Sequence, residues 1–285
     1  MPCLLLALAV AACTQAGAGK SVGWAARSET TVGECGAEDP ATLVPSSEEV
    51  GSDSLSLRLN VPAYRLDAVE GERTVREIQV AVGTPDHPTP TGEFLVTRVT
   101  WNPWWIPPPF EWAKHERLTP PGPTNPTGRV KLYFGEYLYL HGTPVEASLG
   151  QAASHGCVRM SNADAIALAR LVHAHASPRL APTVLDTLEA NSSRTRSIVL
   201  DTPVPLSSRY DLVEVRGGRI EIHPDVYGRH EVGAADVLAA LERAGIRPDQ
   251  VDADRLRSAL RSPPPLAIPL SGILRRPAPQ PAPGG

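Results

Sequence analysis

The stretch Ser154-His155-Gly156-Cys157-Val158-Arg159-Met160 carries a cysteine two residues after a histidine, and His141-Gly142-Thr143-Pro144 supplies a second histidine upstream. Residues two positions apart in an extended segment point to one face, so His155 and Cys157 can lie side by side. Ser161 follows as a good helix N-cap, with Asp164 three residues later completing an approximate capping box. The stretch therefore predicts an extended segment that brings a cysteine to the start of a helix.

Period-two alternation of apolar residues predicts the strands upstream of this stretch. The clearest case is 55–61, where four apolar residues share one side: Leu55, Leu57, Leu59 and Val61. The other predicted strands cover 64–68, 74–82, 94–99 and 130–140, the last of which delivers His141 at its end. Downstream we predict a helix from Ser161 to about Ala176, a short strand over 183–188, a hairpin over 211–223, and helices near 234–244 and 249–261.

These elements predict a mainly β fold. We expect a mixed β-sandwich with one helix behind the loop that carries Cys157, and a small α/β C-terminal appendage. The expected organisation is a signal peptide over 1–18, a flexible tether over 19–53, the main domain over 54–190, a small α/β region over 191–261, and a disordered proline-rich tail over 262–285.

The N-terminal residues suggest export. The apolar run from Leu4 to Ala12 is too short to span a bilayer and suits a signal peptide. Val10-Ala11-Ala12-Cys13 is similar to a lipobox, which would make Cys13 a lipid-anchored residue, whereas Ala16-Gly17-Ala18 offers an ordinary cleavage site. We therefore expect an exported protein of the periplasm or cell envelope, either free or as a membrane-anchored lipoprotein.

Export narrows the roles that the four cysteines can play. Cys3 would be removed and Cys13 removed or lipidated, which leaves Cys35 and Cys157. A disulfide between these two stays open, although Cys35 lies in an unpatterned polar segment. A free Cys157 in an oxidising compartment would need a reason, and catalysis is one.

Charge and composition exclude one class of function and identify one unusual loop. The formal net charge of −4 comes with no basic stripe, so we expect no nucleic-acid partner. Four of the five tryptophans lie within 101–128, a proline-rich segment that is long for a structureless loop: Trp101, Trp104, Trp105 and Trp112. This segment is either a functional lid over a site or a cover for the sheet.

The chemistry of the Cys157 stretch has three interpretations. The first is catalysis with Cys157 as the nucleophile. A nearby histidine can take the thiol proton, the helix start favours the thiolate, and the backbone N–H of Gly156 can approach a developing oxyanion. His141, His155 and Cys157 could instead bind zinc. A buried cysteine that only packs is the third alternative.

Four motifs resemble those of the L,D-transpeptidase catalytic domain family, also called YkuD or ErfK/YbiS-like. The signature is Ser154–Arg159 with His141-Gly142 upstream. Val61–Leu66 is similar to the opening strand of the family, Val82-Gly83 with Thr89–Phe94 to its next segment, and Asp225–Arg229 to a C-terminal element. The resemblance covers about 55–230 and implies a YkuD-type fold, with an L,D-transpeptidase catalytic domain over 54–190.

The resemblance also implies a role for each residue of the signature. Cys157 would be the nucleophile, His141 the proton donor and acceptor, and the Gly142 carbonyl would orient the His141 ring. His155 would support them, and the Gly156 N–H would bind the oxyanion. Among substrate-binding residues we place Ser154, Arg159, Trp104 and Trp105, and the family needs neither a metal nor another cofactor.

The implied reaction is acyl transfer on peptidoglycan stem peptides. Cys157 would attack the stem tetrapeptide, release D-alanine and pass the acyl group to an amine, giving a 3–3 crosslink or attachment of a lysine-bearing wall protein. Inhibition by carbapenems is a further expectation. The alternatives are an L,D-carboxypeptidase, with water as the acceptor, and a non-catalytic wall-binding protein.

Overall fold

A computed structural model describes residues 54–275, which form thirteen β-strands and five α-helices. The predicted signal peptide over 1–18, the lipobox at Cys13 and the tether over 19–53 lie outside the described residues. Strands dominate the described part of the chain, so the predicted mainly β class is confirmed.

Eight strands form the main sheet, in the order β3-β2-β1-β10-β5-β6-β7-β9. Their bounds are β1 Leu55–Asn60, β2 Arg65–Glu70, β3 Arg73–Gln79, β5 Gly92–Trp101, β6 Val130–Tyr133, β7 Tyr139–Thr143, β9 Val158–Ser161 and β10 Arg196–Arg209. Two short strands, β4 Val82–Gly83 and β8 Ala152–Ser154, pair in parallel beside it. The alternation that predicted β1 is confirmed, because Leu55, Leu57 and Leu59 are buried.

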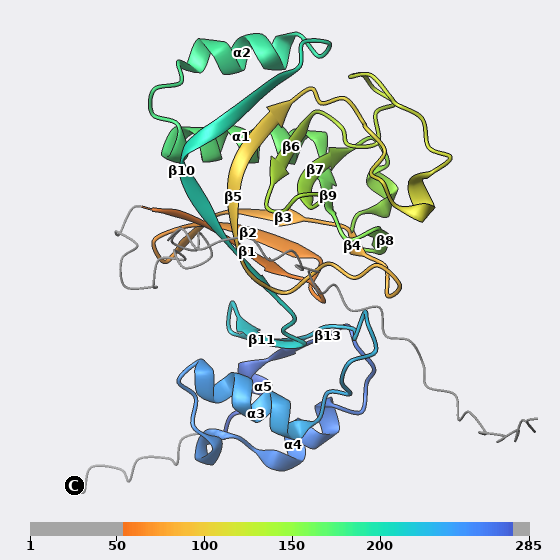
Figure 1. Cartoon of the computed structure of the whole chain (residues 1–285). Coiled ribbons are helices and arrows are strands. Elements are labelled where there is room, and N and C mark those ends of the chain that lie inside the picture. Colours follow the sequence, from red (N-terminus) through yellow and green to blue (C-terminus); the bar gives the residue numbers. More distant parts are fainter. Residues whose placement is uncertain (1–53, 276–285) are drawn as a thin grey trace, which may run out of the picture. The chain divides into compact units, whose positions relative to one another are not determined.

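The long strand β10 lies in the middle of this sheet, between β1 and β5 (Figure 1). It pairs in parallel with β1 and antiparallel with β5. The sequence predicts that the main domain ends at 190 and that 191 opens the C-terminal region. That boundary is wrong, because 196–209 complete the main sheet.

The predicted single strand over 130–140 is two antiparallel strands, β6 and β7, joined by a turn. Leu132 lies opposite Leu140, and Lys131 lies opposite His141. His141 therefore lies inside β7, with β6 on one side and β9 on the other.

One helix, α1 (Asn162–Ala176), packs against β6, β7, β9 and β10, as predicted. The Asp164 backbone N–H donates to the Ser161 side chain at 3.0 Å, which confirms the predicted cap. Its buried apolar face is Ala165, Leu168, Ala169, Val172 and Ala176, and these residues join the core of the main sheet.

The same face of α1 carries one buried histidine. The indole N–H of Trp101 donates to His173 Nε2 at 3.2 Å, so the ring proton lies on Nδ1, which is 3.2 Å from the Ser177 hydroxyl. Burial lowers the pKa of His173 to about 4. The neutral ring is thus part of the folded core.

The strand predicted over 183–188 is wrong, because Pro182–Ala190 form helix α2. Thr183, Val184 and Leu185 suit a strand by propensity, but Pro182 occupies the first helical turn, where its fixed φ is favourable. Leu185 and Leu188 are buried at a helical spacing of three, which explains the choice.

The C-terminal region has its own three-stranded sheet, in the order β11-β12-β13, and its own apolar cluster. Its elements are β11 Val213–Arg216, β12 Arg219–Ile222, α3 Ala234–Arg243, α4 Ala253–Ala259, β13 Leu266–Pro269 and α5 Leu270–Ile273. The predicted hairpin and both helices are confirmed. The predicted disorder over 262–285 is wrong for 266–273, because β13 pairs with β12 and Ile268 and Ile273 are buried; residues 276–285 lie outside the described part.

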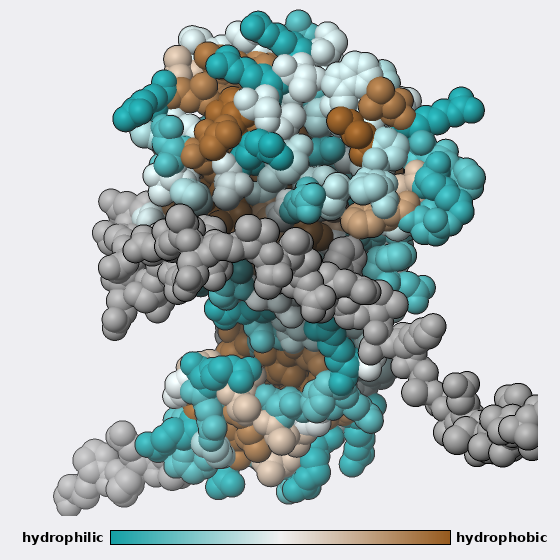
Figure 2. Space-filling view, viewed as in Figure 1, coloured by the Kyte–Doolittle hydropathy of each residue, from teal (hydrophilic) through white to brown (hydrophobic). Residues whose placement is uncertain are grey.

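Within residues 54–275, five large apolar side chains are exposed: Trp104, Ile106, Leu118, Val145 and Val199. On the face drawn in Figure 2, apolar areas alternate with hydrophilic residues. None of the helices in the described range has the length and hydropathy that crossing a bilayer requires.

Candidate active site

Cys157 lies on a short turn between β8 and β9. Gly156 has φ of +100°, a conformation that other residues rarely adopt, so a glycine at this position lets the chain turn into β9. The Cys157 side chain is half-buried and carries a free thiol, which donates to the Tyr137 carbonyl at 3.4 Å. Cys157 is therefore a free, partly exposed thiol on a turn fixed by the Gly156 backbone conformation.

Thr89 connects this turn to the segment that precedes β5. Its fully buried hydroxyl accepts from the Gly83 N–H at 2.8 Å and donates to the Gly156 carbonyl at 3.0 Å. Its own N–H donates to the Tyr227 hydroxyl at 3.0 Å. Three family-like motifs thus meet at Thr89, and together they hold the turn beside Cys157.

His141 is 4% exposed, and its Nδ1 lies 2.7 Å from the carbonyl oxygen of Gly142. A carbonyl only accepts, so Nδ1 carries the proton and Nε2 has a free lone pair. A Cβ on Gly142 would lie 2.3 Å from Asn162 Oδ1, so a glycine is required for this approach. The predicted Gly142 contact is present, and it leaves His141 ready to accept a proton at Nε2.

Polar residues on three adjacent strands share the face of the sheet that carries His141. Lys131 on β6 lies directly opposite His141 on β7, and His141 lies opposite Arg159 on β9. Directly paired residues project to the same side of a sheet. Cys157 lies two residues before Arg159, so the thiol is on this face too. Parallel pairing of β7 and β9 therefore brings the two signature segments together.

Electrostatics favour a neutral resting site. Burial raises the pKa of the Cys157 thiol to about 11, against the lowering effects of a Tyr139 backbone hydrogen bond, Lys131 and Arg159. Burial lowers the pKa of His141 to about 3; the Gly142 carbonyl opposes this, whereas Arg159 and Lys131 reinforce it. Thiol and imidazole are thus both uncharged near neutral pH.

His155 is exposed and stacks on an aromatic side chain that our prediction left out of the site. The Trp112 ring lies 4.0 Å from the His155 ring, with an angle of 7° between their planes, and His87 lies 4.8 Å away on tilted planes. Partial burial, His87 and Arg159 lower the pKa of His155. Trp112 thus links the long loop to the segment before Cys157.

Ser154 and Gly156 hold the turn by hydrogen bonds. The Ser154 hydroxyl is buried, donates to the Cys157 carbonyl and accepts from the Gly156 N–H at 3.2 Å. The predicted substrate contact at Ser154 is therefore not accessible in this structure. An oxyanion role for the Gly156 N–H would require exchange of its present bond.

Trp104 and Trp105 lie on the long loop with different exposure. Trp104 is 44% exposed, and its carbonyl accepts from the Lys131 ammonium at 3.4 Å. Trp105 is half-buried, its indole N–H is buried without a hydrogen-bond partner, and its ring stacks 6.5 Å from Trp112.

Arg159 is half-buried and forms no ion pair within residues 54–275.

The zinc interpretation of His141, His155 and Cys157 finds no support in their arrangement. Within the described part of the chain, the side chains whose ligand atoms converge closely enough for a metal are Glu214, Glu221 and His223. Arg65 already lies among these carboxylates, 2.7 Å from Glu214 and 3.5 Å from Glu221. The protein's own Arg65 thus already supplies a cation to these carboxylates.

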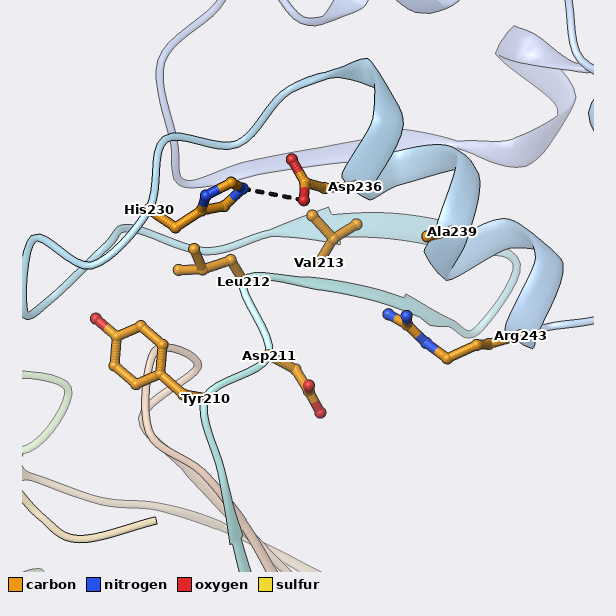
Figure 3. Close-up of a pocket in the computed structure, with 8 residues that line it drawn as sticks. All are labelled: Tyr210, Asp211, Leu212, Val213, His230, Asp236, Ala239 and Arg243. Carbon is orange, nitrogen blue, oxygen red and sulfur yellow. Dashed lines mark hydrogen bonds and ion pairs between the residues drawn. The ribbon is translucent and has the colours of Figure 1, made fainter. Parts of the chain in front are cut away.

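A pocket of about 300 Å³ lies in the C-terminal region (Figure 3). His230 and Asp236 form a hydrogen bond at one side, and Arg243 lies farther along α3. None of its lining residues belongs to the Cys157 site. The pocket is therefore separate from the Cys157 turn and its neighbours.

Three residues at the site escaped sequence reasoning: Lys131, Thr89 and Trp112. Lys131 interrupts the apolar run from Val130 to Leu132, but only the register places it opposite His141. Thr89 lies in a quoted motif without an assigned role. Trp112 is one of several tryptophans in its loop, and no local signal singles it out.

The L,D-transpeptidase catalytic domain (YkuD) model matches residues 56–205, more than half of the chain. Among curated proteins, the probable L,D-transpeptidase ErfK/SrfK of Salmonella typhimurium is 30% identical over 135 residues, covering 44% of each chain. YkuD of Bacillus subtilis is 31% identical over 139 residues, 48% of this chain and 66% of that protein. The chain thus spans less than two thirds of these relatives.

Among solved structures, an L,D-transpeptidase from Mycobacterium smegmatis aligns with a TM-score of 0.35 and 14% identity, over 55% of this chain and 58% of that one. The match of the family model includes both histidines and the cysteine of the site described above. This chain therefore belongs to the L,D-transpeptidase catalytic domain (YkuD) family.

Proposed function

We propose that the protein is a cysteine-dependent L,D-transpeptidase that acts on peptidoglycan stem peptides. The observation that carries the proposal is the His141–Gly142 hydrogen bond, which leaves Nε2 free to take a proton on the face that carries the free Cys157 thiol. A protein that only binds the wall would not need this tautomer.

In the first half-reaction the Cys157 sulfur attacks the carbonyl carbon of the third stem residue, and its proton passes to His141 Nε2. The peptide C–N bond then breaks, and His141 returns the proton to the departing amino group of D-alanine. A low pKa makes His141 a strong acid once protonated, which favours this return. An acyl thioester on Cys157 remains.

In the second half-reaction an acceptor amine attacks the thioester carbonyl and gives its proton to His141. The C–S bond breaks and regenerates the cysteine. A stem-peptide amine would yield a 3–3 crosslink, a lysine would attach a wall protein, and water would yield a carboxypeptidase. Arg159, with no carboxylate partner among the described residues, suits an anionic group of the stem.

We place the protein in the cell envelope, exported by its N-terminal segment and free or lipid-anchored through Cys13. Mass spectrometry of the exported protein tests the anchor. Cleavage before an acylated Cys13 supports it, and an unmodified N-terminus beyond Ala18 refutes it.

Exposure of the full-length protein to a carbapenem, followed by mass spectrometry, tests the nucleophile. We expect a covalent adduct that is absent from Cys157→Ala; folded wild type without an adduct would overturn the proposal. Incubation with purified muropeptides then separates the acceptors, because a crosslinked dimer, a shortened stem and a protein conjugate have different masses.

A further inference from the structure

Lys131 is a buried cation beside the proposed nucleophile, and no role has been assigned to it so far. Only 4% of the residue is exposed, although it lies in a strand whose other face is the apolar core. Its ammonium donates to the Trp104 carbonyl at 3.4 Å and lies 4.8 Å from the Tyr139 ring centroid. The Trp105 ring is 5.6 Å away. Lys131 is thus enclosed by aromatic rings and one carbonyl.

No carboxylate within residues 54–275 forms an ion pair with Lys131. Buried lysines normally pair with an anion, because desolvation of an isolated charge is costly. Aromatic faces and a single carbonyl compensate that cost only in part. Two nearby groups can become anions, but burial raises the pKa of the Tyr139 phenol, which leaves the Cys157 thiol as the candidate. Electrostatic coupling between Cys157 and Lys131 acts on the pKa of both.

Strand register explains how the two groups face each other. Lys131, His141 and Arg159 form one row across β6, β7 and β9. Tyr139 and Cys157 each lie two residues before a member of that row, so they project from the same face. The sulfur contacts the turn before β7 through the Tyr137 carbonyl, and the Lys131 ammonium lies over Tyr139, the first residue of β7.

We propose that Lys131 is a positioning residue for the reaction, whose buried ammonium provides the fixed counter-charge for the Cys157 thiolate. Before the sulfur ionises, the ammonium lacks an anion; when the thiol proton leaves for His141, the thiolate completes the pair. The same charge acts against a protonated His141 and so drives the proton onward to the leaving amine. This inference deepens the proposed function. The counter-charge for the thiolate stands without that function, and only the proton transfer from His141 to the leaving amine rests on it.

The pKa values agree with this arrangement. Burial lowers the pKa of Lys131 to about 8, and the interaction with Cys157 opposes that lowering. The positive charge is therefore present at pH 7 and lost as the pH rises through 8. The other charged or titratable groups on this face are Arg98, Tyr133, Tyr137, Tyr139, His141 and Arg159.

Alkylation of Cys157 in the full-length protein tests the inference without a peptidoglycan substrate. Lys131→Met should slow alkylation by iodoacetamide about tenfold at pH 7, equivalent to a rise of about one unit in the apparent pKa of the thiol. Lys131→Arg should restore most of the rate. Arg98→Met is the matched control, because Arg98 is also a cation over a tyrosine ring, 4.0 Å from the Tyr133 centroid. The alkylation rate of Arg98→Met should equal that of wild type.

A second measurement uses wild-type protein and covers the case in which Lys131→Met does not fold. Iodoacetate is anionic and iodoacetamide is neutral, so the ratio of their rates reports positive charge at the sulfur. We expect the rate with iodoacetate divided by the rate with iodoacetamide to fall severalfold between pH 7 and pH 9, as Lys131 loses its charge. A ratio independent of pH, or a folded Lys131→Met with the wild-type alkylation profile, would overturn the inference. If the alkylation results are as expected but the wild-type protein does not turn over muropeptides, the proposed function is refuted and the inference about Lys131 stands.

Discussion

Thr89→Val replaces the hydroxyl that joins the nucleophile turn to the preceding segment with a methyl group of similar size. The hydroxyl is fully buried and serves two backbone groups, the Gly83 N–H at 2.8 Å and the Gly156 carbonyl at 3.0 Å. Valine can serve neither, and water has no access to replace the bonds. The perturbation therefore leaves two buried polar groups without partners and changes little else.

Each orphaned group costs roughly 1–3 kcal/mol, so we expect a loss of about 2–6 kcal/mol in the free energy of unfolding. For a folded unit of this size the melting temperature should fall on the order of 10 °C. Because the Gly156 carbonyl precedes Cys157, alkylation of the thiol should slow as well. Thermal unfolding and iodoacetamide kinetics at pH 7 measure the two effects.

Thr89→Ser is the matched control, because serine keeps both hydrogen bonds and loses only one methyl group. We expect it to cost about 1 kcal/mol and to leave alkylation close to that of wild type. If the valine and serine variants unfold at the same temperature, the hydroxyl does not hold the turn, and the account of Thr89 is wrong.

Three other predictions address histidines and the aromatic loop. His141→Ala should slow carbapenem acylation by roughly 10²–10⁴-fold, whereas His155→Ala should slow it less than about tenfold; the reverse order in stopped-flow acylation would contradict the assignment. Trp112→Ala removes the ring 4.0 Å from His155, so the pKa of His155 should rise toward its ordinary value in an NMR titration; an unchanged pKa would refute the contact. The pKa of His173 is about 4 in the fold against about 6.5 when unfolded, so stability is fully present above pH 6.5 and should fall by up to about 3 kcal/mol as the pH drops to 4. Urea unfolding of His173→Gln should lack this component, and identical acid slopes in both proteins would count against it.

Local sequence was sufficient where the signal is periodic or where a residue must satisfy a neighbour in the chain. The alternation of Leu55, Leu57 and Leu59 predicted β1, because a pleated strand turns every second side chain to the core. The Ser161 cap predicted where α1 begins, because the free N–H groups of a first helical turn need a nearby acceptor. The Cys157 signature predicted the family, because its residues are contiguous in the chain and can be read without the fold.

Sequence failed where a short segment suits two structures. Residues 183–188 are apolar and β-branched enough for a strand, yet they form α2, because burial of Leu185 and Leu188 selects the helical spacing. Residues 266–273 lie within a proline-rich C-terminal stretch that predicts disorder, but the free edge of β12 supplies partners for β13.

The sequence by itself identified the candidate site residues and their local setting: the Cys157 signature, the upstream His141-Gly142 pair and the helix capped by Ser161. Only the tertiary structure decided what surrounds them. β10 enters the main sheet from about a hundred residues downstream of β5, and strand register sets Lys131 opposite His141 and His141 opposite Arg159. The physical reason is that period-two alternation specifies which face a side chain takes, whereas its cross-strand neighbours depend on hydrogen bonds between segments far apart in the chain.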